Sequence, residues 1–183
     1  MNLESLEKLI NSELTTKINS SSINHDELKL KIDEEDLHSV ILFLKNDTRT
    51  KFRQLIDITA VDYPERDTRF KLIYFLLSHE NNLRLNIEFE IKENYQVKSI
   101  TSIFPSSNWM EREVFDMYGI HYKDHPDLRR ILTDYGFEGH PMRKDFPLSG
   151  YVEFRYDETR KKIIGEPVEL AQEFRTFTYE MPW

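Results

Sequence analysis

The segment that decides the fold is residues 70–92, FKLIYFLLSHENNLRLNIEFEIK. Its first part, residues 70–78, is apolar at nearly every position, as expected of a strand in the middle of a sheet. Residues 79–82 have the polar composition of a hairpin turn, and residues 83–91 then alternate apolar and polar side chains strictly. Such alternation is typical of an antiparallel strand with one buried face. The segment therefore predicts two paired strands at the centre of a sheet.

The sequence on either side of this hairpin predicts further helices and strands. We expect helices over residues 2–13, 33–46 and 106–118, and strands over residues 27–32, 53–63 and 96–103. The serine-rich residues 20–24 are expected to form a loop, and Ser106 or Ser107 to cap the last helix, which Gly119 ends. The sum predicts an α+β fold. It is a two-layer domain over residues 1–119, with a mixed, mostly antiparallel sheet and helices on one face, followed by an extended C-terminal tail over residues 120–183.

The tail has an unusual composition for a chain terminus. All five glycines lie from Gly119 onward, and five of the seven prolines lie from Pro126 onward. It is also rich in aromatic residues and arginines, whereas disordered tails carry few aromatics. We detect neither the period of a strand nor that of a helix in it, so its backbone needs water or another surface for its hydrogen bonds. Aromatic residues and arginine are enriched at protein interfaces, and the tail is therefore interpreted as one.

Composition excludes several classes of function. A content of 39% apolar and 13% aromatic residues is enough for a folded core. The net charge of −8 argues against binding to nucleic acid, which needs a basic face. The absence of cysteine excludes disulfides, thiolate nucleophiles and cysteine-held iron–sulfur clusters. No apolar run approaches the roughly 18 residues that a membrane-spanning helix needs.

Three groups of polar residues are candidates for catalytic or ligand sites. His121, Asp124 and His125 suggest a metal site, and with it a small metal-dependent hydrolase, but Gly119 and Pro126 disfavour the helix that would bring the two imidazoles together. Ordinary hydrogen-bonding histidines are the better interpretation. The second group is the carboxylate pair Glu111 and Glu113, and the third is a candidate phosphate clamp formed by Asp127, Arg129 and Arg130.

Neither of the last two groups has the pattern that its chemistry needs. Residues two apart on a helix point in different directions, which argues against joint acid–base chemistry by the two glutamates. The arginines lack a preceding glycine-rich cradle, so salt bridges are the better interpretation. On the same helix we expect Trp109, Val114 and Phe115 to be buried and Arg112 to pair with Asp116 at i, i+4 spacing.

Two motifs carry a resemblance to a known family. They are EREVFDMY at residues 111–118 and HPDLRRIL at residues 125–132, and the match continues through residues 133–141, 143–151 and 166–175, with Met142 as a conservative departure. Upstream, residues 55–63 resemble the family's first long strand. The chain thus resembles the 30 kDa subunit of respiratory complex I and its bacterial counterpart, over nearly all of its length after residue 50. A related hydrogenase or photosynthetic complex with an equivalent subunit remains an alternative.

The resemblance implies a core subunit of the hydrophilic arm of the H⁺-translocating NADH:ubiquinone oxidoreductase. It implies no cofactor and no catalytic residue in this chain, with FMN, iron–sulfur clusters and ubiquinone held by other subunits. The implied partners are the 49 kDa subunit, which bears the quinone site, and the neighbouring iron–sulfur subunits, with the tail wrapping over the former. With only two alanines, the composition suggests an AT-rich genome, such as organelle DNA or that of certain bacteria. Because the family includes members encoded in mitochondrial DNA, the resemblance implies a mitochondrially encoded member. The implied place is the matrix side of the mitochondrial inner membrane, with the cytoplasmic face of a bacterial plasma membrane as the alternative.

The residues expected at the interface with these partners are the charged and aromatic members of the matching motifs. They are Glu111, Arg112, Glu113, Asp116, His125, Asp127, Arg129, Arg130, Tyr135, Phe137, His140, Arg143, Lys144, Asp145, Phe146, Tyr151, Phe174 and Arg175.

Overall fold

The computed structural model describes residues 2–172, and the chain divides into two compact units, Met1–Asp145 and Phe146–Trp183. The expected division into residues 1–119 and a tail over 120–183 remains a prediction about which part wraps a partner. By its own contacts, the first unit continues past Gly119 to Asp145.

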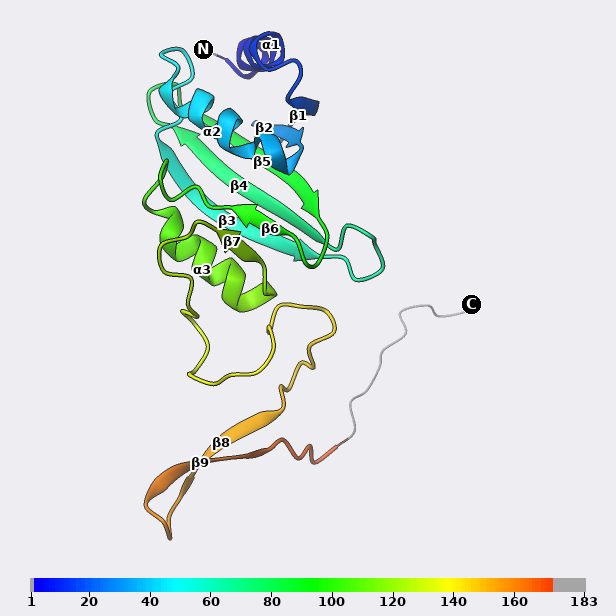
Figure 1. The fold of residues 1–183 in the computed structure, drawn as a ribbon, viewed down its shortest axis with the longest axis vertical. Coiled ribbons are helices and arrows are strands. Elements are labelled where there is room, and N and C mark those ends of the chain that lie inside the picture. Colours follow the sequence, from blue (N-terminus) through cyan, green and yellow to red (C-terminus); the bar gives the residue numbers. More distant parts are fainter. Residues whose placement is uncertain (1, 173–183) are drawn as a thin grey trace. The chain divides into compact units, whose positions relative to one another are not determined.

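A five-stranded sheet forms the centre of the first unit (Figure 1). Its strands are β1 (Ile18–Asn24), β2 (Glu27–Ile32), β3 (Gln54–Asp62), β4 (Phe70–Ser78) and β5 (Leu83–Ile91). They lie in the order β1-β2-β5-β4-β3, and only β2 and β5 pair in parallel. The predicted hairpin is confirmed as β4 and β5, which lie in the interior of the sheet.

The register of the sheet places apolar residues of four strands on one face. Leu30 pairs with Ile87, Ile87 with Tyr74, and Tyr74 with Ile58, so these side chains form a row across the sheet. A parallel row runs through the neighbouring positions Leu28, Leu85, Leu76 and Leu55. All eight are buried. Because side chains alternate between the faces of a strand, this one register fixes the core side of the sheet.

Three α-helices complete the first unit. They are α1 (Leu3–Glu13), α2 (Leu37–Asn46), which follows the short 3-10 turn η1 (Glu34–Asp36), and α3 (Ser107–Tyr118). In Figure 1, α2 crosses one face of the sheet and α3 lies alongside β3. Helix α1 contributes Leu6 and Ile10 to the core, and α2 contributes four apolar residues at helical spacing. The predicted α+β class with a mixed, mostly antiparallel sheet is confirmed. Among residues 2–172, no helix is long and apolar enough to cross a bilayer.

The prediction of a loop at residues 20–24 was wrong, because this segment belongs to strand β1. β1 is the edge strand next to β2, and most of its residues are exposed. An edge strand that is exposed on both faces does not need alternating apolar residues. The serines of β1 therefore give no alternation from which a strand could be predicted. α1 and β1 are nevertheless connected by the side chains of Asn11 and Ser21, which are hydrogen-bonded at 3.0 Å.

The predicted strand over residues 96–103 was too long. It ends at Lys98, and the strand β6 (Gln96–Lys98) pairs in parallel with β7 (His121–Lys123), which was not predicted. Residues 99–103 form turns that bury Ile100 and Ile103 against the core. The start of α3 also differs from the prediction, since Ser106 makes no side-chain cap hydrogen bond.

The second unit contains a β-hairpin that was also missed. β8 (Val152–Asp157) pairs antiparallel with β9 (Lys162–Pro167), and Asp157 Oδ1 accepts the backbone N–H groups of Thr159 and Arg160 in the turn. One face carries Val152, Phe154 and Tyr156 opposite Pro167, Gly165 and Ile163. On the other face, Arg155 donates two hydrogen bonds to Glu166, at 2.6 and 2.8 Å. This part of the tail therefore has the period of a strand.

The central row of the core allows a matched test. Ile87→Ala is expected to lower the free energy of unfolding by about 2–5 kcal/mol, because it leaves a cavity among fully buried side chains. The control is Ile56→Ala on β3, the same change at a side chain that is 40% exposed, and its effect should be far smaller. Urea unfolding of both variants measures the difference. Equal losses for the two variants would contradict the assigned core face.

Candidate functional site

The predicted interface residues of the first unit converge on α3 and the segment that follows it, residues 120–145. Gly119 ends α3 in the left-handed conformation, with φ at 75°. A Cβ atom at this position would lie 2.6 Å from side-chain atoms of both His140 and Arg143. Glycine is thus required twice here, for the backbone conformation and for the returning chain to approach.

The Asp116 carboxylate is the main anchor of the segment. Its Oδ2 accepts the backbone N–H groups of Ile131, Leu132 and Thr133 at 3.1, 2.8 and 2.9 Å. Its Oδ1 accepts the Thr133 hydroxyl at 2.6 Å and the Arg130 guanidinium at 2.8 Å. Burial alone would raise the pKa of Asp116, but the hydrogen bonds from Thr133, Leu132 and Arg130 outweigh it and hold the pKa well below its usual range.

Arg112 binds the carbonyl groups of the same backbone stretch, whereas Asp116 accepts its N–H groups. Its Nε donates to the carbonyl of Arg129 at 3.1 Å, and its Nη2 donates to the carbonyl of Arg130 at 3.2 Å. The expected i, i+4 ion pair between Arg112 and Asp116 is therefore wrong. The two side chains lie one helical turn apart, but both bind the peptide backbone of residues 129–133. This backbone has no strand partner among the described residues, and α3 supplies its hydrogen bonds.

A second buried aspartate, Asp62 at the end of β3, anchors the far end of the segment. It forms a bidentate pair with Arg69, at 2.8 and 3.1 Å, and accepts the backbone N–H of Lys144 at 2.8 Å. Arg69 also reaches Asp145 at 2.8 Å. Burial works against ionisation of Asp62, yet the Arg69 guanidinium and the Lys144 N–H keep its pKa lowered.

His140 and Arg143 close the segment back onto the end of α3. His140 Nδ1 donates to the carbonyl of Asp116 at 2.9 Å, so its proton lies on Nδ1. Burial, the largest cause, lowers the pKa of His140. Arg143 Nε donates to the carbonyl of Tyr118 at 2.6 Å, and its Nη1 binds Glu93 at 2.7 Å. Two carbonyls in the last turn of α3 are thus satisfied by side chains from the returning chain.

The remaining predicted residues fall into three groups. Glu113, Asp127, Arg129, Tyr135, Lys144, Asp145 and Tyr151 are exposed. Phe137 lies beside the Arg130 guanidinium, and Phe146 packs edge-on against Tyr151 within the second unit. Glu111 is buried, and so is the side chain of His125. Phe174 and Arg175 lie outside the described residues.

Sequence reasoning missed the apolar side chains exposed in the same part of the first unit. Trp109 was expected to be buried but is 70% exposed, while Val114 is buried and Phe115 half-buried. Leu132 is 63% exposed although the backbone beside it is fixed by Asp116. A helical wheel would have revealed Trp109, because it lies one turn before the exposed Glu113. Large apolar side chains on an ordered backbone are characteristic of binding surfaces.

The metal-site hypothesis gains no support from the positions of its residues. His125 Nε2 donates inward to the carbonyl of Asn108 at 3.1 Å, and the exposed His121 packs against the Phe115 ring. Within residues 2–172, no three His, Asp or Glu side chains are placed to share a metal ion.

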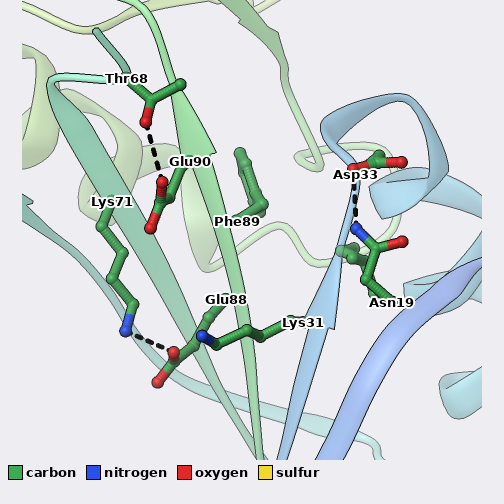
Figure 2. A pocket seen from close by; sticks show the side chains of 9 residues that line it. Asn19, Lys31, Asp33, Thr68, Lys71, Glu88, Phe89 and Glu90 are labelled. Atoms are coloured by element: carbon green, nitrogen blue, oxygen red, sulfur yellow. Dashed lines mark hydrogen bonds and ion pairs between the residues drawn. The ribbon is translucent and has the colours of Figure 1, made fainter. Parts of the chain in front are cut away.

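An open pocket of about 310 Å³ lies at β1, β2, β4 and β5. Figure 2 shows the side chains that line it. Its polar groups bind one another. Lys71 pairs with Glu88, Thr68 donates to Glu90 at 2.8 Å, and Asn19 donates to Asp33 at 2.8 Å (Figure 2). The pocket offers charges of both signs, most of them already paired, which does not define a ligand class.

The fold of this chain is found in a solved respiratory assembly. A chain of the membrane-bound sulfane sulfur reductase, an archaeal respiratory membrane complex, superposes with a TM-score of 0.69 at 21% identity, covering 88% of this chain and 98% of that one. The class of protein is thus an α+β chain with the fold of a respiratory-complex component.

Sequence comparison gives the family. Residues 30–152 match the model of the respiratory-chain NADH dehydrogenase 30 kDa subunit. The C subunit of NADH-quinone oxidoreductase from Mesorhizobium japonicum is 46% identical over 99% of this chain and 90% of its own length. The C subunit from Dinoroseobacter shibae is 54% identical over 90% of this chain and 76% of its own length. The chain belongs to the family of the 30 kDa, or C, subunit of NADH-quinone oxidoreductase.

The anchoring role of Asp116 predicts a pH-dependent loss of stability. Asp116→Asn should lower the free energy of unfolding by about 3 kcal/mol at neutral pH, because it weakens several buried charged hydrogen bonds at once. A carboxylate whose pKa is lowered on folding stabilises above its unfolded pKa of 3.8 and loses that effect as pH falls. The difference between variant and wild type should therefore shrink in acid. Urea unfolding across pH measures it.

The matched control is Asp127→Asn, which removes a carboxylate from an exposed pair with Arg129 at 2.9 Å. Its effect should stay below about 1 kcal/mol. A loss for Asp116→Asn that is independent of pH would contradict the ionised anchor.

Proposed function

We propose that this chain is a structural subunit of the hydrophilic arm of NADH:ubiquinone oxidoreductase, with no cofactor and no catalytic residue of its own. In this proposal it packs on the 49 kDa subunit that bears the quinone site and contacts the neighbouring iron–sulfur subunits. It thereby supports electron transfer from NADH to ubiquinone in an H⁺-translocating enzyme, while FMN and the iron–sulfur clusters stay on other subunits. Its proposed place is the matrix side of the mitochondrial inner membrane, or the cytoplasmic face of a bacterial plasma membrane.

One observation carries the interface part of this proposal. Three charged residues of the motifs that follow Glu111 are occupied in fixing backbone, namely Arg112, Asp116 and Arg143. Large aromatic or aliphatic side chains face solvent beside them, namely Trp109, Leu132 and Tyr135, and exposed charged residues such as Glu113 and Arg129 lie in the same part of the chain. An active site needs titratable groups aimed at a substrate, whereas an interface needs apolar anchors on a rigid backbone. The arrangement fits the second.

The proposed interface therefore has two kinds of residue. The first kind fixes the backbone that carries the surface and is not expected to touch a partner. Its members are Arg112, Asp116, Arg130, His140 and Arg143. Glu113, Asp127, Arg129, Tyr135, Lys144 and Asp145 in the first unit, and Tyr151 in the second, are the predicted contact residues.

Tyr135 provides a direct test, because its side chain is fully exposed. Tyr135→Ala should weaken incorporation of the chain into the complex by about 5- to 30-fold, as expected for loss of an aromatic anchor worth 1–2 kcal/mol. Thermal unfolding of the isolated chain should not change. Tyr135→Phe, which keeps the ring, should assemble normally, as should the remote surface variant Leu42→Ala. Blue-native electrophoresis with in-gel NADH dehydrogenase staining measures assembly, and full assembly of Tyr135→Ala would contradict a contact here.

Deletion of residues 146–183 separates folding from assembly. The buried core residues of the described chain all lie between Leu6 and Tyr122, so the truncated chain should unfold at nearly the same temperature as the full one. It should fail to enter the complex, because the hairpin with its exposed Phe154 and Ile163 is proposed to bind a partner. Complete assembly of the truncated chain would refute the wrapping role of the tail.

A further inference from the structure

A carboxyl group poorly supplied with hydrogen bonds lies inside the first unit. Glu111 projects from α3 into the core and is fully buried. Its Oε1 accepts the backbone N–H of Ile100 at 2.9 Å. Among the described residues its Oε2 has no hydrogen-bond partner, and the same is true of three other buried oxygens, those of Ser107, Tyr74 and Tyr122. A buried carboxylate normally accepts two or three hydrogen bonds, so this environment is unfavourable for an anion.

The basic side chain that lies against Glu111 is His125, whose Nε2 is 3.9 Å from Oε2. The hydrogen bonds of the imidazole define its state. Its Nδ1 accepts the backbone N–H of Asp127 at 3.1 Å, and a backbone N–H can only donate. Nδ1 is therefore unprotonated, and the single ring proton lies on Nε2, which donates to the carbonyl of Asn108. A neutral imidazole provides no positive charge to stabilise an ionised Glu111.

The groups facing Glu111 from the other packed elements are also neutral. Tyr74 comes from β4 and Tyr122 from β7, and both hydroxyls have a pKa well above the usual value, because of burial first and the nearby Glu111 as well. Burial is also the largest cause of the raised pKa of Glu111, and it outweighs the hydrogen bond from the Ile100 N–H, which acts in the opposite direction. An isolated buried charge is among the most costly features that a core can contain.

We propose that Glu111 is a buried proton-binding site, which takes up one proton on Oε2 when the chain folds and keeps it at neutral pH. The neutral acid is a hydrogen-bond donor as well as an acceptor, and the hydroxyls of Ser107 and the two tyrosines, which interact with Glu111, can both donate and accept. One proton thus removes a buried charge and lets Oε2 donate as well as accept, as the neighbouring hydroxyls can. The site is separate from the anchors on the same helix, because Asp116 is ionised and fully hydrogen-bonded.

The direction of the pH effect follows from linkage. The pKa of Glu111 is higher in the folded chain than its unfolded value of 4.5, so folding binds a proton over the interval between the two. The stabilisation by Glu111 is complete at pH values below its unfolded pKa, and it is lost as the pH rises through its folded pKa. Asp116 acts in the opposite direction, since its contribution is lost in acid. Two carboxyl groups five residues apart on α3 thus make the stability of the fold depend on pH in opposite directions: the contribution of Asp116 is lost in acid, and that of Glu111 is lost as the pH rises.

The test uses the full chain with ¹³C-labelled glutamate. Infrared spectra at about pH 7 should show the carbonyl band of one protonated carboxylic acid, shifted by the label, and Glu111→Gln should remove it. Absence of this band from the wild-type chain would overturn the proposal, and that result does not depend on whether any variant folds.

Urea unfolding provides the second measurement. Glu111→Gln replaces the acid by a neutral group of the same shape, so its urea midpoint should increase relative to wild type as pH rises above about 4.5. Glu113→Gln, two residues along the helix and exposed, should follow the wild type at every pH. A Glu111→Gln midpoint that runs parallel to the wild type across the whole range would mean that folding binds no proton at this position, which contradicts the proposal.

Discussion

The first unit depends on one carboxylate that takes the place of a neighbouring strand. Residues 129–133 pass α3 with no strand beside them, in the described part of the chain, to take their backbone groups. The Asp116 oxygens accept three successive N–H groups of this stretch. Arg112, one helical turn earlier, takes two carbonyls. Loss of this interaction would leave polar backbone unsatisfied against a helix. The positions of Arg130, His140 and Arg143 all follow from the path that these two side chains impose.

The regular part of the fold could be predicted from the sequence because its signals are local. Residues 70–91 alternate or run apolar in a way that only a buried hairpin explains, and β4 begins and ends where the pattern does. β8 carried the same period-2 signal at residues 152–157, but its surroundings of glycine, proline and charge concealed it. β1 had no signal to detect, because an exposed edge strand buries too little to constrain its side chains.

The candidate site was harder to predict for a different reason. Sequence patterns identified Arg112, Asp116, Arg130 and Arg143 as important but not their partners, since each binds backbone from a distant segment. Spacing on a helix indicates which side chains are neighbours, not which of them will bind a loop about 15 residues away. Glu111 shows the same limit. Its neighbour Arg112 faces the loop, while Glu111 itself faces the core, and one residue of helix rotation separates the two environments.

Gly119 makes the length of α3 a fixed quantity. The helix carries Arg112 and Asp116 one turn apart and must stop where the chain can turn with positive φ beneath His140 and Arg143. One residue inserted between Arg112 and Gly119 would rotate one end of the helix by about 100° relative to the other, turning an anchor away from its backbone partners. The stretch from Arg112 to Gly119 therefore has room for neither insertion nor deletion. The contacts within the subunit are thus sufficient to exclude insertions and deletions in this helix, whatever partner the subunit binds.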